Sequence, residues 1–149
     1  MTPIDRLVVV VVGRPAPQGS KHHGVAGQMR EASAYLPPWR AAVKLAAVRV
    51  MKELGVAPDD RPVFRGAVGL SVCFRLHTGQ RIDGPPDLDK LVRGVCDALT
   101  LARVWEDDAR VVYLNASKTT VENPSWAGAR IVINQMYVHE FAGAAAIPK

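Results

Sequence analysis

Six segments of the chain have a spacing of hydrophobic and polar residues that predicts regular structure. A continuous β-branched run at 7–12 is typical of a strand covered on both faces, so we expect it inside the sheet. Apolar residues alternate with small or polar ones at 68–76 and 112–121, as in strands, and a strand of mixed burial is expected at 129–136. In two other segments apolar residues recur every three or four residues, as in helices. In chain order we expect strand 7–12, helix 39–54, strand 68–76, a helix from Leu88, strand 112–121 and strand 129–136.

This order of strands and helices predicts an α/β fold, a single domain with a mixed β-sheet flanked by two main helices. The 149 residues are enough to bury a core without disulfides or structural metals. We expect the domain to span residues 1–142 and the Ala-rich residues 143–149 to form a disordered tail. Cys73 and Cys96 lack the paired spacing of a zinc or redox motif and are expected to be small buried hydrophobic residues.

Prolines and glycines mark the expected helix ends. Pro37 and Pro38 are expected to introduce the first helix at Trp39, and Gly55 to close it in the left-handed conformation. The second helix is expected to begin after Pro85-Pro86, with Asp87 as its N-cap. The apolar face of the first helix comprises Val43, Ala46, Ala47, Val50, Met51 and Leu54. Its basic residues, which either contact phosphate or form a solvated face, are Arg40, Lys44, Arg49 and Lys52.

Positive charge exceeds negative charge, with 19 Lys and Arg against 14 Asp and Glu and a net charge of +5. This balance favours a polyanionic partner, nucleic acid before an anionic membrane. The hydrophobic runs are too short to span a membrane and the opening residues lack the basic segment of a secretory leader, so a cytoplasmic location is expected. The expected DNA contacts in loops are Arg14, Lys21, His22, His23 and Arg81.

The loop at 13–24 is the expected mobile DNA-contacting arm. It superficially resembles a phosphate-binding P-loop, but five residues separate Gly13 from Gly19 instead of four, and Ser20 precedes Lys21 instead of following it. Two prolines in the loop also remove donor N–H groups, so no nucleotide cofactor is expected. The adjacent His22 and His23 have no further ligand nearby, and a solvated or phosphate-facing role is favoured over metal binding.

Four acids flank the second helix, Asp87 and Asp89 at its start and Asp107 and Asp108 at the following loop-to-strand junction. One interpretation is purely structural, with a cap, a first-turn acid favoured by the helix dipole, and an ordinary turn. The other brings Asp87, Asp89 and one of the later pair around a divalent cation. Carboxylates held close together repel and need a cation, and Mg²⁺ suits ligands that are all oxygen.

Residues 85–112 resemble the core motif of the RusA-type Holliday junction resolvases. The residues that carry the resemblance are Asp87-Leu88-Asp89, Arg93, Asp97-Ala98-Leu99 and Trp105-Glu106-Asp107-Asp108. Upstream, the stretch at 13–21 and Pro38-Trp39-Arg40 look like the N-terminal part of phage and prophage members. Spacing alone leaves Asp107 and Asp108 equivalent, whereas the resemblance selects Asp108 as the third metal ligand beside Asp87 and Asp89.

The resemblance implies a RusA-like fold and a homodimer that nicks four-way DNA junctions symmetrically with Mg²⁺, or with Mn²⁺. Arg93 stands where the family usually has an essential lysine, so it is expected to clamp phosphate instead of donating a proton. Two further positions depart from the family: Lys90 stands where asparagine is common, and Pro86 where some members have a basic residue. Lys90 is also an expected DNA contact. The alternative is a basic DNA-binding module in which these departures mark a lost catalytic activity.

Overall fold

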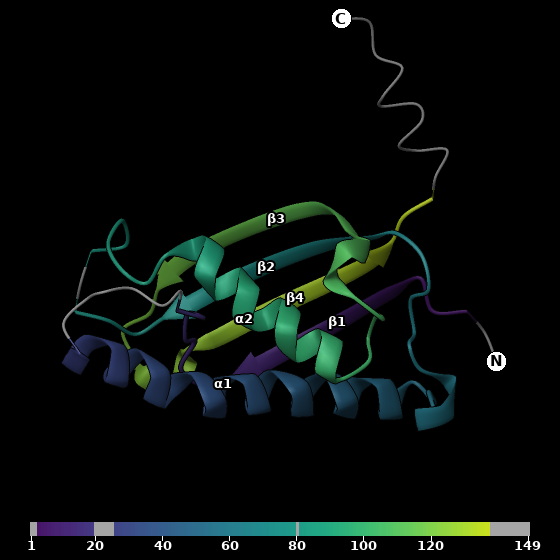
Figure 1. Cartoon of the computed structure of the whole chain (residues 1–149), viewed down its shortest axis with the longest axis horizontal. Helices are drawn as coiled ribbons and strands as arrows, with labels where there is room; N and C mark the ends of the chain where they lie inside the picture. The colour runs from purple at the N-terminus through teal and green to yellow at the C-terminus, as the bar shows by residue number, and fades with distance from the viewer. Residues whose placement is uncertain (1–2, 20–25, 80, 138–149) are drawn as a thin grey trace, which may run out of the picture.

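The protein is a four-stranded mixed sheet with two helices on one of its faces (Figure 1). The computed structural model describes residues 3–19, 26–79 and 81–137, with side chains of 26–33 excepted. The strand order is β1-β4-β2-β3, in which β2 and β3 run parallel and the other pairs run antiparallel. The main elements are β1 (Arg6–Val12), α1 (Ala26–Glu53), β2 (Val68–Leu76), α2 (Leu88–Leu101), β3 (Val111–Thr120) and β4 (Gly128–Gln135). The α/β architecture predicted from the sequence is therefore confirmed.

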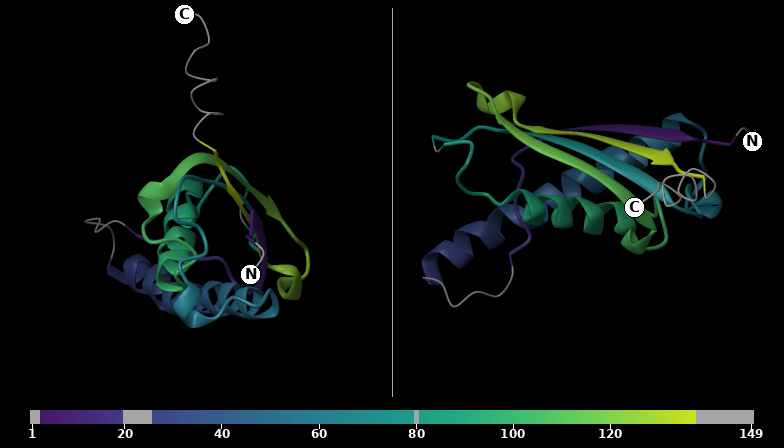
Figure 2. Two further views of the ribbon diagram at one scale, coloured as in Figure 1. Left: turned by 90° about the vertical axis from the view of Figure 1, so that its right-hand side faces the viewer. Right: turned by 90° about the horizontal axis from the view of Figure 1, so that it is seen from above.

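The core lies between the sheet and the helices. Figure 2 shows α1 and α2 on the same side of the sheet. On that side β1, β2 and β4 place fully buried side chains, including Leu7, Leu70, Phe74 and Ile131, against the helices. Burial of this apolar layer provides the main stabilisation of the fold and fixes α2 on α1 and β3.

The expectation that strand 7–12 lies inside the sheet and is covered on both faces is wrong. Among the described strands β1 lies at an edge of the sheet and pairs only with β4, and its side chains alternate between buried and open faces. Val10 and Val12 are 56% and 68% exposed, whereas Val9 and Val11 are buried. Every residue of this run is apolar, so the sequence does not indicate which side chains are buried. The helices lie on one face of the sheet, and the side chains of β1 on that face are the buried ones.

The expected start of the first helix is also wrong, because α1 begins at Ala26 and runs through Pro37 and Pro38. Proline in a helix interior costs about 3 kcal/mol because it lacks an N–H donor and crowds the preceding turn. Buried side chains further along, including Trp39, Val43 and Met51, fix the helix beyond the prolines to the core. The predicted left-handed residue that follows the helix is confirmed, since Gly55 has a φ of +81°.

Leu54 is 50% exposed, so its expected place on the buried face of α1 is wrong. The helix already ends at Glu53, and the chain turns so that Val56 occupies the core instead, with its N–H bonded to the Met51 carbonyl oxygen at 2.9 Å. Cys96 is buried as predicted, whereas Cys73 is only half-buried because it lies on the sheet face opposite α1 and α2.

No helix in the described ranges is long and apolar enough to cross a membrane. The predicted boundary at residue 142 and the predicted tail at 143–149 lie outside the described residues.

Gly128 at the start of β4 is expected to tolerate no side chain. A Cβ atom there would overlap the carbonyl oxygen of Val11 and lie 3.0 Å from Nη2 of Arg75. We expect Gly128→Ala to destabilise the fold by roughly 3 kcal/mol, since strand pairing holds the Val11 backbone and a hydrogen bond to the Trp126 carbonyl oxygen holds the Arg75 guanidinium. Thermal unfolding measures this, with Gly66→Ala as the control because no atom lies within 4 Å of the added Cβ. Equal melting temperatures would contradict the observed contact between β1 and β4.

Candidate functional site

The first turn of α2 carries Asp87 and Asp89, the earlier pair of predicted metal ligands. The helix begins at Leu88 as predicted, and Asp87 occupies the N-cap position with extended backbone angles. Its side chain makes no capping hydrogen bond, so that part of the cap prediction is wrong. The carboxylate instead lies 3.4 Å from Nζ of Lys90 and is 60% exposed. Because it does not satisfy the helix N–H groups, the Asp87 carboxylate is available for another positive partner.

The segment that leads to Asp87 is bonded to the sheet by Lys118 of β3. Lys118 Nζ donates to the carbonyl oxygen of Gly84 at 2.6 Å and to that of Pro86 at 2.9 Å. The sequence pattern placed Lys118 only on the polar continuation of a strand, because a contact across 32 residues has no local signature.

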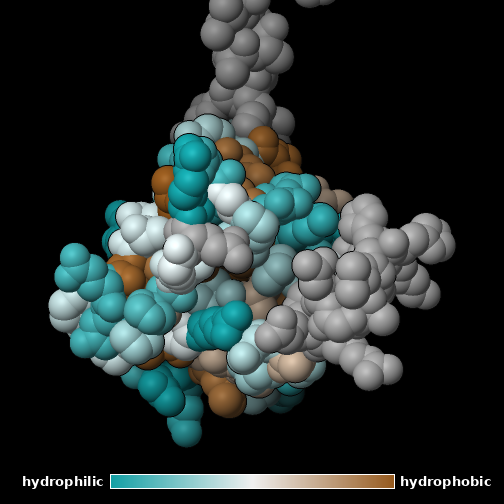
Figure 3. All heavy atoms as spheres, turned by 90° about the vertical axis from the view of Figure 1, so that its left-hand side faces the viewer, coloured by the Kyte–Doolittle hydropathy of each residue, from teal (hydrophilic) through white to brown (hydrophobic). Residues whose placement is uncertain are grey.

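Figure 3 views the end of the molecule that is at the left of Figure 1, where hydrophilic side chains predominate among smaller hydrophobic patches.

Asp89, Arg93 and Asp97 follow at intervals of one helical turn and form a charged row on α2, as its amphipathic pattern predicted. Asp89 and Arg93 are exposed and Asp97 is half-buried. Within the described part of the chain, the Arg93 guanidinium makes no hydrogen bond or ion pair. Its five N–H donors are thus open to an oxyanion such as a phosphate.

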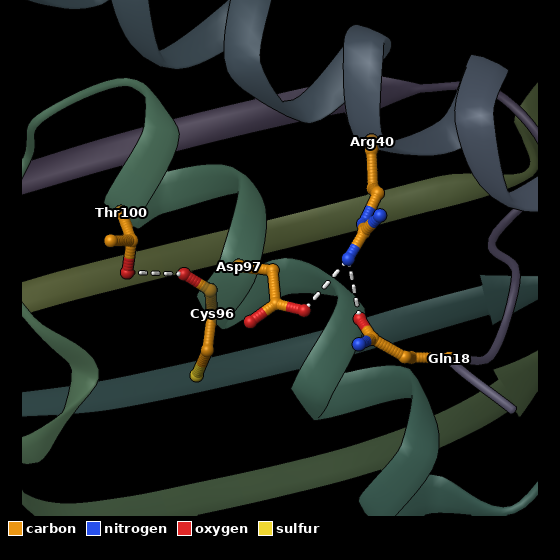
Figure 4. Close-up of polar contacts among 5 residues, drawn as sticks. All are labelled: Gln18, Arg40, Cys96, Asp97 and Thr100. Atoms are coloured by element: carbon orange, nitrogen blue, oxygen red, sulfur yellow. Dashed lines mark hydrogen bonds and ion pairs between the residues drawn. The ribbon is translucent and has the colours of Figure 1, made fainter. Parts of the chain in front are cut away.

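Asp97 connects the row to α1 through Arg40. Figure 4 shows Nη2 of Arg40 donating both to Oδ2 of Asp97 and to Oε1 of Gln18, each at 2.8 Å. Arg40 therefore belongs neither to a solvated face nor to a free phosphate-binding face, the two alternatives that the sequence left open. It links α1, α2 and the loop after β1, a role that its position among other basic residues did not indicate.

The loop after β1 is held on α2 over its described residues. The Gln18 N–H donates to the Lys90 carbonyl oxygen at 3.0 Å, and Gly94 permits the close approach of the Ala16 carbonyl oxygen. Arg14 stacks on the Tyr35 ring, 3.5 Å from its centroid. Residues 13–19 are thus anchored, contrary to the prediction of a mobile arm. Lys21, His22 and His23 lie outside the described residues.

Asp107 and Asp108 lie at the turn before β3, and that turn is fixed by Trp105. The indole of Trp105 is fully buried and donates to Oγ1 of Thr100 at 2.8 Å, while Thr100 donates to the Cys96 carbonyl oxygen at 3.0 Å (Figure 4 shows the second bond). Asp107 accepts the Ala109 N–H at 2.8 Å and so caps the short helix η2 (Asp108–Arg110). Capping gives Asp107 a structural role at this turn, whereas Asp108 caps no helix.

The surroundings of Asp108 raise the pKa of its carboxyl group. Loss of hydration raises the pKa of Asp108, and Asp107 raises it further through a hydrogen bond and its charge, as does the charge of Asp97. Arg93 acts in the opposite direction. Burial, Asp108 and Asp97 together raise the pKa of the Cys96 thiol to about 12, so this thiol stays protonated and is neither a nucleophile nor a soft metal ligand at neutral pH.

The predicted acids are divided between two places. The groups that act on Asp108 are Asp107, Asp97 and Arg93, whereas Asp87 and Asp89 lie a further one to two turns toward the start of α2. Among the residues that the structure describes, no three carboxylate, imidazole or thiol groups are close enough to share one metal ion. The three-acid metal site stays a prediction. Its donors fit Mg²⁺ in kind, because all are hard carboxylate oxygens and a cation would relieve the repulsion felt at Asp108.

The remaining predicted DNA contacts, Arg14, Arg81 and Lys90, have different surroundings. Arg81 is exposed and pairs with Asp83 at 2.7 Å, an ion pair that solvent weakens. Lys90 is less exposed and pairs with Asp87. Arg14 is exposed apart from its stacking on Tyr35. Positive groups therefore lie on the loop before α2, on its first turn and on the loop after β1.

The raised pKa of Asp108 predicts a pH-dependent effect on stability in the absence of metal. A carboxyl whose pKa is higher in the folded than in the unfolded protein costs nothing below the reference value of 3.8 and destabilises the fold as pH rises through its folded pKa. We therefore expect Asp108→Asn to raise the melting temperature at pH 7 in EDTA, and this gain to shrink toward zero at about pH 3. Melting curves of both proteins across this range test it, and a difference that is independent of pH would contradict the proposed repulsion.

Comparison with known proteins gives a family match and distant structural likenesses. The family model for endodeoxyribonuclease RusA matches residues 13–134, a range that includes every predicted metal ligand. Among solved structures, the protein Atu1372 with unknown function from Agrobacterium tumefaciens is 14% identical, with a TM-score of 0.43, 92% of this chain covered and 81% of that one. No curated protein matches the chain.

Proposed function

Because the chain belongs to the RusA endodeoxyribonuclease family, we propose that it is a metal-dependent endonuclease that resolves four-way (Holliday) DNA junctions in recombination or repair. The observation that carries this proposal is the charged row of α2, in which Arg93 and Asp97 act on the carboxyl of Asp108. An open guanidinium beside a carboxyl whose pKa is raised, that of Asp108, suits the binding of a phosphate together with a cation.

In this proposal Asp87, Asp89 and Asp108 hold the metal, with Mg²⁺ as the preferred ion and Mn²⁺ as a substitute. Asp87 makes no capping bond and Asp89 is exposed, so both carboxylates are accessible to a cation. A bound divalent ion supplies positive charge to the scissile phosphate and makes a water molecule more acidic. Asp107 keeps the cap of η2 in place and so fixes the direction in which the backbone presents Asp108.

Arg93 holds a non-bridging oxygen of the scissile phosphate and offsets the negative charge that develops during hydrolysis. An arginine cannot readily give up a proton, so protonation of the leaving oxygen falls to another group or to water. The DNA backbone on either side is contacted by Arg14, Lys21, His22, His23, Arg81 and Lys90.

Paired symmetric nicks across a four-way junction require two active sites related by a two-fold axis, so the active species is a homodimer. The net charge of +5 supports binding of the DNA polyanion. The proposal thus adds two things to the family assignment: a substrate, the four-way DNA junction, and an assembly, the homodimer.

The second candidate is a basic DNA-binding module without catalysis. The ion pair between Asp87 and Lys90 favours it, because a lysine already neutralises one predicted metal ligand. In that case the protein binds DNA and the acids serve only the local structure.

Cleavage of a synthetic four-way junction separates the two candidates. We expect nicking with Mg²⁺, none with EDTA, and little on a linear duplex of the same sequence. Binding without nicking under all three conditions would favour the non-catalytic module, and equal cleavage of junction and duplex would indicate a general nuclease.

A further inference from the structure

Lys118 makes a contact that the proposed function has not used. It lies on β3 opposite Phe74 of β2, so its side chain is on the face of the sheet that the helices cover. The ammonium is partly buried and donates to the carbonyl oxygens of Gly84 and Pro86, at 2.6 and 2.9 Å. Both acceptors belong to the segment directly before Asp87.

This segment has few means of holding its own shape. Residues 85 and 86 are prolines, which have no N–H to donate, so neither can close a backbone hydrogen bond as donor. The Gly84 N–H bonds to Arg81 within the same loop and therefore does not attach the segment to the sheet. Hydrogen bonds from an ammonium are shorter and stronger than those between neutral groups, and the two from Lys118 make that attachment.

The position of Asp87 is set from both of its sides. On one side its carbonyl oxygen accepts the Leu91 N–H at 3.1 Å and so begins the hydrogen-bond ladder of α2. On the other side its peptide partner Pro86 is bonded to Lys118. Apart from its 3.4 Å ion pair with Lys90, the Asp87 side chain has no capping bond and is 60% exposed, so its place depends mainly on the backbone on either side.

We propose that Lys118 is a positioning residue that clamps the Gly84–Pro86 segment to β3 and thereby holds Asp87 in place for catalysis. This inference rests on the proposed function. It assigns to Lys118 neither a contact with DNA nor a proton transfer, because both of its observed bonds go to carbonyl oxygens of the chain.

The test compares Lys118→Met, which keeps the aliphatic stem and removes the charge and donors, with Lys118→Arg, which keeps both. Thr120→Val is the control, since Thr120 is exposed two residues further along the same strand face. For junction cleavage in Mg²⁺ we expect Lys118→Met to lower kcat about tenfold or more with KM within about twofold, and Lys118→Arg to recover much of the loss. A loss of fold alone would lower the active fraction and would also speed amide exchange in β1 and β4.

Amide hydrogen exchange of the DNA-free protein gives a readout that does not depend on activity. We expect faster exchange in a peptide covering 81–91 of Lys118→Met, with β1 and β4 unchanged, and no such change in Thr120→Val. Unchanged exchange in 81–91, an unchanged kcat, or a loss confined to KM would each overturn the positioning role. If the wild type fails to cut junctions, the proposed function fails, and the exchange result alone then decides whether Lys118 clamps the segment.

Discussion

Replacing Asp108 with asparagine is expected to abolish junction cleavage while leaving junction binding in EDTA unchanged or tighter. In the proposed site the change removes a metal ligand. Even the outer partners of metal ligands cost roughly 10- to 100-fold in activity when removed, so we expect a loss of at least about 100-fold. Binding is expected to behave differently, because the variant loses a negative charge where the proposed function places the scissile phosphate. Nicking rates in Mg²⁺ and gel-shift affinities in EDTA measure the two effects.

Asp107→Asn is the matched control. The side-chain oxygen of an asparagine can still accept the Ala109 N–H that Asp107 now caps, so η2 is kept and the effect on cleavage is milder. This contrast tests the choice between neighbours that the sequence spacing left equivalent. Normal cleavage in both variants would refute a metal site that includes this turn.

Arg93→Ala is expected to remove most of the activity, whereas Arg93→Lys stays active. The guanidinium is exposed between Asp89 and Asp97, has no partner within the described residues, and acts on the charge of Asp108. Loss of one donor that stabilises transition-state charge costs about 10²- to 10³-fold in kcat. Lysine keeps the positive charge, and it is the residue that the family resemblance places there.

Single-turnover cleavage of the junction measures the effect of the Arg93 variants, with Arg65→Ala as the control because Arg65 is exposed in the connection before β2. An alanine variant that cuts normally would return Arg93 to a solvated helix face and direct attention to Lys90.

The sequence predicted best what depends on local periodicity and on prolines and glycines. Leu88 begins α2, its apolar side is buried and Gly55 follows α1 in the left-handed conformation, because helical spacing and backbone restrictions act within a few residues. The edge position of β1 could not be predicted, since a run of valines does not specify whether one or two neighbours pair with it. The start of α1 was missed because the prolines, read as a boundary, are accommodated inside a helix that the core holds in place.

The sequence indicated which residues form the charged row of the site but not which partners they contact. The row of Asp89, Arg93 and Asp97 followed from the helical pattern. The bonds from Arg40 to Asp97 and from Lys118 to Pro86 join residues 57 and 32 positions apart, and no local signal indicates such partners. For the same reason spacing could not place Asp108 relative to the first turn of α2, since their separation depends on how α2 packs on the sheet.

The most direct test of metal-dependent junction resolution is to map cleavage on a four-way junction with each of its four strands labelled in turn. In Mg²⁺ we predict nicks at symmetric positions on two opposing strands, lost in EDTA and in Asp108→Asn, with only weak cutting of the linear arms. Nicks that persist in EDTA or in Asp108→Asn, or cutting of linear duplex at the rate of the junction, would contradict the account.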